Sequence, residues 1–215
     1  MTSFRPDCTG VILAGGMGRR LNGRDKALIQ IGGRPILDYI YRTFSSLFDD
    51  IILVTNQPQS YLDWDLYIAT DLFPVRSSLT GIHAGLFYSS TPYAFVSACD
   101  TPFIQVELIK KILERMDSRF DTIMPETQKG LEPLCAVYAR SCLPRIEQAL
   151  SLGQYKIQRI FKSQRIGRIS EDIIRSIDAN LTCFYNINTP EDMEHAERLL
   201  NAGSLNQPIN RLLEK

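Results

Sequence analysis

The feature that most constrains the fold of this chain is an alternation of short apolar runs with longer segments of helical periodicity. The runs are rich in Ile, Val, Tyr and Phe, which is typical of buried strands, and they occupy residues 9–14, 50–56, 66–71 and 93–100. Between them, apolar residues recur at intervals of three and four, which predicts amphipathic helices over 36–48 and 77–90. This alternation predicts an α/β fold, with a parallel sheet covered by helices on both faces.

The second half of the chain continues the pattern. Further strands are expected at 121–126, 132–139 and 183–188, and helices at 141–153, 155–164 and 189–200. The length of 215 residues suits one hydrophobic core, and the chain shows no internal repeat, low-complexity tract or linker. We therefore expect a single domain over 1–215, in which the polar tail 201–215 is a candidate for a frayed end.

Charge, hydropathy and cysteine content exclude several classes of protein. Lys plus Arg and Asp plus Glu both number 24, and a formal net charge of zero removes the usual electrostatic case for a nucleic-acid partner. No apolar run approaches the roughly twenty residues needed to cross a bilayer. The five cysteines form no C-x-x-C pair, and their odd number suits a reducing compartment better than a disulfide framework. We therefore expect a cytoplasmic protein without a membrane partner.

The loop after the first strand combines glycines with basic side chains in the stretch GVILAGGMGRRLNGRDKAL. Glycine lets backbone N–H groups approach an anion closely, and the basic side chains can neutralise its charge, so a polyphosphate fits this loop. These side chains are Arg19, Arg20, Arg24 and Lys26. The alternative is an ordinary glycine turn with solvated basic side chains. The known glycine fingerprints do not apply, because Leu21 occupies the third Rossmann glycine position and no G-K-[ST] is present. We therefore expect a different phosphate cradle.

Polar residues follow the predicted strands at the edge of the sheet where open parallel sheets bind ligands. They are Asn56, Asp71, Asp100, Asn186 and Asn188. Asp100 directly follows an apolar strand, where a carboxylate is well placed to bind Mg²⁺. The alternative is that Asp100 only caps a helix that begins at Thr101 and Pro102. We favour the metal because the phosphates bound by the loop would need a counter-cation.

The motifs LAGGMGRRLNGRDKAL, VTNQ, TDLFP, CDTPF and NINTPED stand in the order found in the molybdenum cofactor guanylyltransferases, and the chain resembles that family from about Gly10 to Leu200. The opening motif alone indicates a wider group of nucleotidyltransferases. The motifs Asp-Lys-Ala-Leu, Cys-Asp-Thr-Pro and Asn-Ile-Asn-Thr-Pro-Glu-Asp narrow the resemblance. It implies a Rossmann-like, mostly parallel twisted sheet of the nucleotide-diphospho-sugar transferase type, with helices on both faces.

The resemblance also implies an activity and a set of site residues. The implied reaction transfers GMP from GTP to the terminal phosphate of molybdopterin carrying molybdenum, requires Mg²⁺ and releases pyrophosphate. Acceptor molybdoenzymes or their chaperones are candidate protein partners. Asp100 would touch both GTP and magnesium, and Lys26 and Arg19 would act with it in catalysis. The nucleotide-binding positions of the family fall on Leu13, Ala14, Gly15, Gly16, Lys26, Asn56, Asp71, Asp100, Asn186 and Asn188.

Other functions stay open. The stretch SSLTGIHAGL replaces the usual Gly-Pro-Leu-Ala-Gly, a loop that helps to choose the base. A cytidylyltransferase for the same cofactor, or a nucleotidyltransferase for another phosphorylated metabolite, is therefore an alternative. A nucleotide-binding module without catalysis is a third hypothesis, although such a module would not need Asp100 together with Lys26.

The remaining polar and aromatic features have ordinary structural interpretations. His83 and His195 lie in helical patterns, and Cys99 should point into the core. Tyr61 and Trp64 are interpreted as aromatic residues that fix a surface loop. The basic run 156–168 is interpreted as a solvated helix face, with guidance of an anionic substrate as the alternative. Glu132 and Pro133 occupy a segment that varies among relatives and is a candidate to face the second substrate.

Overall fold

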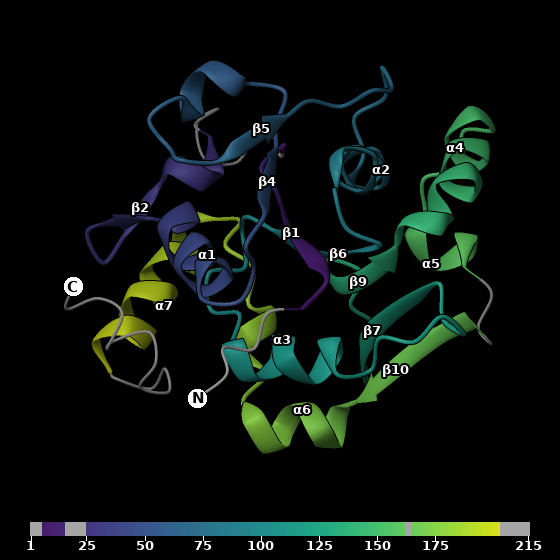
Figure 1. Ribbon diagram of the computed structural model, residues 1–215. Helices are drawn as coiled ribbons and strands as arrows, with labels where there is room; N and C mark the ends of the chain where they lie inside the picture. Colours follow the sequence, from purple (N-terminus) through teal and green to yellow (C-terminus); the bar gives the residue numbers. More distant parts are fainter. Residues whose placement is uncertain (1–5, 16–24, 162–164, 203–215) are drawn as a thin grey trace.

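An eight-stranded sheet forms the centre of the protein (Figure 1). The computed structural model describes residues 6–15, 25–161 and 165–202. Along the sheet the order is β10, β7, β9, β6, β1, β4 and β5, and β8 pairs with β7. The strands are β1 (Cys8–Leu13), β4 (Ile51–Val54), β5 (Tyr67–Ala69), β6 (Tyr93–Ala98), β7 (Thr122–Thr127), β8 (Gly130–Leu131), β9 (Cys135–Ala139) and β10 (Ile166–Ser170).

Most of the sheet is parallel, which confirms the predicted fold class. β1 pairs in parallel with both β4 and β6, β4 pairs in parallel with β5, and β7 pairs in parallel with β10. β9 runs antiparallel to its neighbours β6 and β7. The carboxyl ends of β1, β4, β5 and β6 therefore meet at one edge of the sheet, where their following loops can share a ligand.

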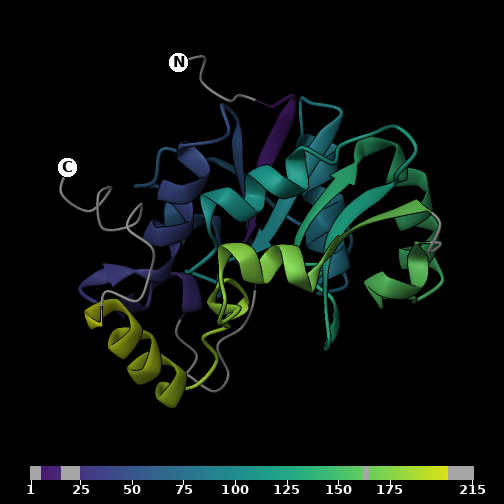
Figure 2. The ribbon, with the colours of Figure 1, turned by 90° about the horizontal axis from the view of Figure 1, so that it is seen from below.

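Helices cover both faces of this sheet, as the alternating sequence pattern predicts. One face carries α1 (Ile36–Ser45), α3 (Val106–Leu113) and α6 (Glu171–Ile177), and the other carries α2 (Ser78–Tyr88), α4 (Leu143–Ser151) and the short α5 (Ile157–Ile160). Figure 2 shows α3 and α6 lying across one face. Successive side chains of β1 point to opposite faces, so Ile12 packs with the first group and Val11 with the second.

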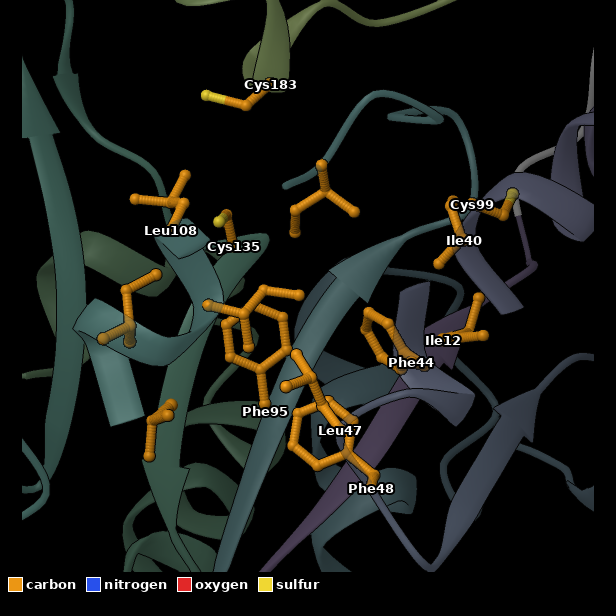
Figure 3. Close-up of a cluster of buried hydrophobic side chains, with 14 of the residues drawn as sticks. Ile12, Ile40, Phe44, Leu47, Phe48, Phe95, Cys99, Leu108, Cys135 and Cys183 are labelled. Atoms are coloured by element: carbon orange, nitrogen blue, oxygen red, sulfur yellow. The ribbon is translucent and has the colours of Figure 1, made fainter. Parts of the chain in front are cut away.

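The core on the α1 face is built around aromatic rings (Figure 3). Phe44 of α1 and Phe48, three residues after the end of the helix, lie with ring centroids 5.2 Å apart. Phe95 of β6 contacts both of them, at centroid distances of 5.6 and 5.9 Å. Each large side chain buried in this way adds a few kcal/mol to the hydrophobic stabilisation, about 1.5–3 kcal/mol. This cluster joins α1 to the central strands and sets the position of the chain that precedes α1.

A third, smaller cluster joins the last helix to the body of the protein. α7 (Pro190–Asn201) packs beside the hairpin of β2 (Gln30–Ile31) and β3 (Arg34–Pro35). Ile31, Phe103 and Ile187 are fully buried there. No helix in the described part of the chain is long and apolar enough to cross a membrane.

The structure corrects three expectations about elements. Residues 183–188 do not form a strand: a 3-10 helix spans Thr182–Phe184, and alternate residues Cys183 and Ile187 are buried in separate clusters. The sheet position at that edge is taken by β10, whose five residues were not predicted as a strand. The helix expected at 155–164 is limited to Ile157–Ile160 among its described residues. An alternating pattern of apolar and polar residues indicates which side chains are buried. It does not show whether the backbone pairs with a neighbouring strand.

Two glycines let α2 lie close to β1. A Cβ atom on Gly85 would come within 2.5 Å of Val11 Cγ1, and one on Gly81 within 3.1 Å of Leu13 Cδ2. The glycines are four residues apart and thus lie on one face of the helix. This close approach directs the N-terminus of α2 toward the ligand-binding edge of the sheet.

We predict that Gly85→Ala lowers the free energy of unfolding by about 1–2 kcal/mol, because overpacking against a stiff β-branched side chain exceeds the gain in helix propensity. Thermal and denaturant unfolding measure this change. Gln148→Ala, at an exposed position of α4, is the control and should leave the midpoint nearly unchanged. Equal midpoints for the two variants would contradict the close packing of α2 on β1.

Candidate functional site

A cavity of about 520 Å³ opens at the carboxyl ends of the parallel strands. Leu13 and Gly15 reach it from the end of β1, Asn56 from the loop after β4, Asp71 from the loop after β5, and Asp100 from the turn after β6. The topology therefore brings together residues that are far apart along the chain. Ala14 does not line this cavity; it is buried, and its amide donates to the carbonyl of Val54 at 2.8 Å. Gly16 and Arg19 lie outside the described residues.

Lys26 lies at the centre of the polar side of the cavity. Its Nζ donates a hydrogen bond to Asn188 Oδ1 and is 3.6 Å from Asp100 Oδ2. Asn186 lines the same cavity. A cation, a carboxylate and two amides from distant segments thus face one space, which is the composition expected for binding a charged phosphate chain.

Asp25 and Tyr61 hold Lys26 in place, and the sequence analysis did not identify either as a site residue. Asp25 caps the 3-10 helix Lys26–Leu28 by accepting a hydrogen bond from the amide of Ala27 at 3.1 Å. The fully buried Tyr61 donates its hydroxyl proton to Asp25 Oδ2 at 2.5 Å. Burial and this hydrogen bond raise the pKa of Tyr61, so the phenol keeps its proton. Asp25 could have been suspected, because an N-cap residue directly precedes Lys26.

Asp100 sits in a turn and not at the start of a helix. α3 begins at Val106 and has Gln105 as its N-cap residue, so the interpretation of Asp100 as only a helix cap is wrong. The turn is fixed by Thr101, whose hydroxyl donates to the carbonyl of Ala98 at 2.8 Å. Burial raises the pKa of Asp100 above its ordinary value, and the nearby Lys26 ammonium opposes this shift. The burial of this carboxylate therefore lowers the stability of the folded protein.

Asn188 is positioned by the capping box at the start of α7. Thr189 accepts a hydrogen bond from the amide of Asp192, and Asp192 Oδ2 accepts from the amides of Asn188 and Thr189 at 2.8 and 2.9 Å. The amide of Ile187 donates to the carbonyl of Asp100 at 2.9 Å. These bonds tie the segment 186–188 to the turn after β6, although the two lie nearly ninety positions apart in the sequence.

Asn56 and Asp71 form a reciprocal pair on another side of the cavity. Asn56 Nδ2 donates to Asp71 Oδ2 at 2.7 Å, and the amide of Asp71 donates to Asn56 Oδ1 at 3.4 Å. Burial raises the pKa of Asp71, while the hydrogen bond from Asn56 and the charge of Arg76 oppose the shift. Such a pair presents hydrogen-bond donors and acceptors in fixed positions, which suits a part of a ligand that carries no charge.

The N-terminal end of α2 completes the cavity with residues of the stretch SSLTGIHAGL, which the motif comparison relates to choice of the base, and with Arg76, which the sequence did not indicate. Arg76, Ser77, Ser78 and Gly81 line it. Ser77 caps the helix by accepting a hydrogen bond from the amide of Thr80 at 3.1 Å. The helix N-terminus adds a favourable field for negative charge at this edge. The position of this helix N-terminus depends on the close packing of the α2 glycines against β1. The periodicity of the sequence does not predict that packing.

The remaining polar and aromatic side chains take the structural places that the sequence predicts. His83 is buried in α2, with Nε2 3.1 Å from Glu147 Oε1, and His195 lies in α7. Cys99 is buried in the hydrophobic cluster of the α1 face. Trp64 meets Tyr41 edge-on, with ring centroids 5.9 Å apart, and so fixes the surface loop.

Residues 162–164 of the basic run, and with them Lys162, lie outside the described part of the chain. The other two candidates for guiding a substrate, Lys156 and Arg159, are exposed. Neither of them lines the cavity at the strand ends. Their exposure agrees with the interpretation of a solvated helix face.

Comparison of the sequence with known proteins gives a consistent family. The model of the MobA-like NTP transferase domain matches residues 10–169. A molybdenum cofactor guanylyltransferase from Desulfosudis oleivorans is 45% identical, over 92% of this chain and 98% of its own length. A probable molybdenum cofactor guanylyltransferase from Natranaerobius thermophilus is 36% identical, over 89% and 96% of the two chains.

Solved structures agree with this result. Molybdopterin-guanine dinucleotide biosynthesis protein A from Archaeoglobus fulgidus superposes with a TM-score of 0.80 at 27% identity, covering 90% of this chain and 99% of its own. A nucleotidyl transferase from Methanothermobacter thermautotrophicus shares the fold, with a TM-score of 0.68 at 16% identity over 91% and 98% of the chains. The resemblance seen in the motifs is thereby confirmed, and the chain belongs to the molybdenum cofactor guanylyltransferase family of MobA-like NTP transferases.

Proposed function

We propose that this protein transfers GMP from GTP to the terminal phosphate of molybdopterin carrying molybdenum, so that the guanine dinucleotide form of the cofactor is made and pyrophosphate is released. The observation that carries the proposal is the meeting of Lys26, Asp100 and Asn188 in one cavity at the strand ends. The names of the relatives support the choice of guanine and of molybdopterin. Molybdoenzymes or their chaperones are the proposed receivers of the product.

The reaction needs positioning and charge neutralisation more than a covalent nucleophile. An oxygen of the acceptor phosphate attacks the α-phosphorus of GTP. The bond from that phosphorus to the bridging oxygen breaks, and its electron pair leaves with pyrophosphate. Lys26 balances negative charge that collects on the phosphate oxygens, and the side chains of Asn186 and Asn188 donate hydrogen bonds to them. We assign the base and ribose to the side of the cavity formed by Asn56 and Asp71.

We propose Mg²⁺ as the metal of this reaction, bound by Asp100. The described residues hold no cluster of three or more His, Cys, Asp or Glu side chains that could hold a metal ion. One carboxylate that lines the cavity fits Mg²⁺, which commonly takes one or two protein carboxylates and completes its shell with substrate phosphates and water. When bound, the ion would withdraw electron density from the phosphates and hold them in place.

The proposal is tested by incubating the protein with Mg²⁺, molybdopterin and each of GTP, CTP, ATP and UTP separately. We expect pyrophosphate release and a guanine dinucleotide only with GTP, identified by mass spectrometry. Preference for CTP would indicate the cytidylyltransferase. Binding of a nucleotide without pyrophosphate release would indicate a non-catalytic module, and would contradict the proposed activity.

We predict that Asp100→Asn lowers kcat for guanylyl transfer by at least about 100-fold, because it removes the charge that holds the cation. The midpoint of thermal unfolding should not fall, because the Lys26 ammonium keeps its hydrogen bond to Asn188 Oδ1. A carboxyl group whose pKa is raised in the folded protein destabilises the fold when it ionises, so neutral Asn removes that cost near pH 7.

Asp63→Asn is the matched control for this prediction, since Asp63 is exposed and lines no part of the cavity. It removes the same charge from the chain and should leave kcat unchanged. Near-normal activity of Asp100→Asn at saturating Mg²⁺ would contradict the metal assignment.

Tyr61→Phe tests whether the hydrogen bond to Asp25 positions Lys26. We expect kcat/KM for GTP to fall roughly tenfold, as for the loss of one hydrogen bond to a charged group. The control is Tyr41→Phe, because the Tyr41 hydroxyl has no hydrogen bond among the residues that the structure describes. If steady-state kinetics show equal loss in both variants, Tyr61 has no positioning role.

A further inference from the structure

A second cavity, of about 660 Å³, lies beside the first. It is formed by the hairpin of β7 and β8, the first turn of α6, the segment 180–186 and α7. Apart from Asn186, no residue that lines this cavity has a role in the proposed handling of GTP. Its volume suits a ligand of the size of a fused two-ring heterocycle with a substituent.

The two cavities are neighbours, as two observations show. Asn186 lines both of them. In addition, Glu132 lines the second cavity while Leu134, two residues later, lines the first. Because Asn186 borders both cavities, a ligand of the second cavity that extends past Asn186 would approach the residues that are proposed to bind the reacting phosphates, Lys26 and Asp100.

Two carboxylates face the second cavity, and they differ in the number of hydrogen bonds that they accept from the protein. Glu171 accepts hydrogen bonds from the amide of Gln128 at 2.6 Å and from Arg175 Nε at 2.7 Å. Glu132 Oε1 has one long contact, 3.4 Å from the hydroxyl of Thr127, and its Oε2 has no hydrogen-bond partner among the described residues. Glu132 is half-buried, and this burial raises the pKa of its carboxyl group. A ligand that donates hydrogen bonds would complete the partners of Glu132.

Aromatic rings also line the second cavity. Phe184, Tyr185 and His195 line it, and the Tyr185 and His195 rings lie with centroids 5.1 Å apart. The Tyr185 hydroxyl is held by Asp192 Oδ1 at 3.1 Å, within the same capping box that positions Asn188. Rings fixed in this way suit a flat heterocycle.

We propose that the second cavity binds the pterin of the acceptor, with the Glu132 carboxylate accepting hydrogen bonds from its pyrimidine edge. This inference rests on the proposed function. A 2-amino-4-oxopteridine presents two adjacent donors, the ring N3–H and the 2-amino group, which match the two oxygens of one carboxylate. Glu132 thus selects the pterin, while Asn186 marks the passage through which the phosphate of the same molecule enters the first cavity.

Glu132→Gln tests the proposal, because it keeps the size of the side chain and replaces one acceptor oxygen with a donor. We expect KM for molybdopterin to rise about tenfold or more, while kcat at saturation and the dissociation constant for GTP stay near the wild-type values. Glu107→Gln, at an exposed position of α3, is the matched control and should change neither constant.

Binding of simple pteridines gives a readout that does not depend on catalysis. The fluorescence of 2-amino-4-oxopteridine, titrated with the full chain, should report binding that Glu132→Gln weakens about tenfold. Lumazine, which carries an oxygen in place of the 2-amino group, should bind the wild type more weakly than the pterin does, and Glu132→Gln should narrow that difference.

The outcomes separate the two proposals. Guanylyl transfer by the wild type with an unchanged molybdopterin KM in Glu132→Gln overturns the role of Glu132 and leaves the proposed function standing. Absence of transfer in the wild type contradicts the proposed function, whereas pteridine binding still decides whether the cavity selects a pterin. Equal pterin and lumazine affinities in the wild type, or no binding of either, overturn the inference.

Discussion

The approach of the Lys26 ammonium to the Asp100 carboxylate, at 3.6 Å, is the interaction on which the geometry of the site depends. Both groups are largely buried, and charges taken out of water are stable only when they are paired and held in place. Asp25 and Tyr61 supply that support on the Lys26 side, and the bond from Ile187 to the carbonyl of Asp100 supplies it on the other. In the proposed reaction, binding of phosphate and a cation beside these groups would offset the cost of burying their charges.

The same supports link the catalytic centre to the two ends of the proposed substrates. The capping box of α7 fixes Asn188 through the backbone and Tyr185 through its hydroxyl, so one local motif serves both cavities. On the nucleotide side, the glycine face of α2 allows the helix to reach Val11 and Leu13, and its first turn becomes part of the cavity wall. Rigid elements therefore carry both binding surfaces, which favours fixed distances between the reacting groups.

Much of the fold could be predicted because strands and helices in this chain differ in hydrophobic period. The runs that became β1, β4, β5 and β6 end in Ala14, Asn56, Asp71 and Asp100, and parallel topology brings such ends together. The prediction was wrong where the hydrophobic period of the sequence does not match the pairing of strands in the sheet. Residues 183–188 alternate like a strand, yet their apolar members are buried in two clusters while β10 pairs with β7. Tyr61 was interpreted only as a loop residue, because its bond to Asp25 crosses 36 positions.

The sequence by itself determined the alternation of strands and helices, the polar residues at the strand ends and the local caps, because each depends on neighbours a few positions apart. Tertiary structure alone decided that Lys26 meets Asp100 and Asn188, that α2 closes on β1, and that Glu132 faces a second cavity that shares Asn186 with the first. These contacts join segments separated by tens of residues. They form only when the sheet order and the packing of whole helices bring the segments together.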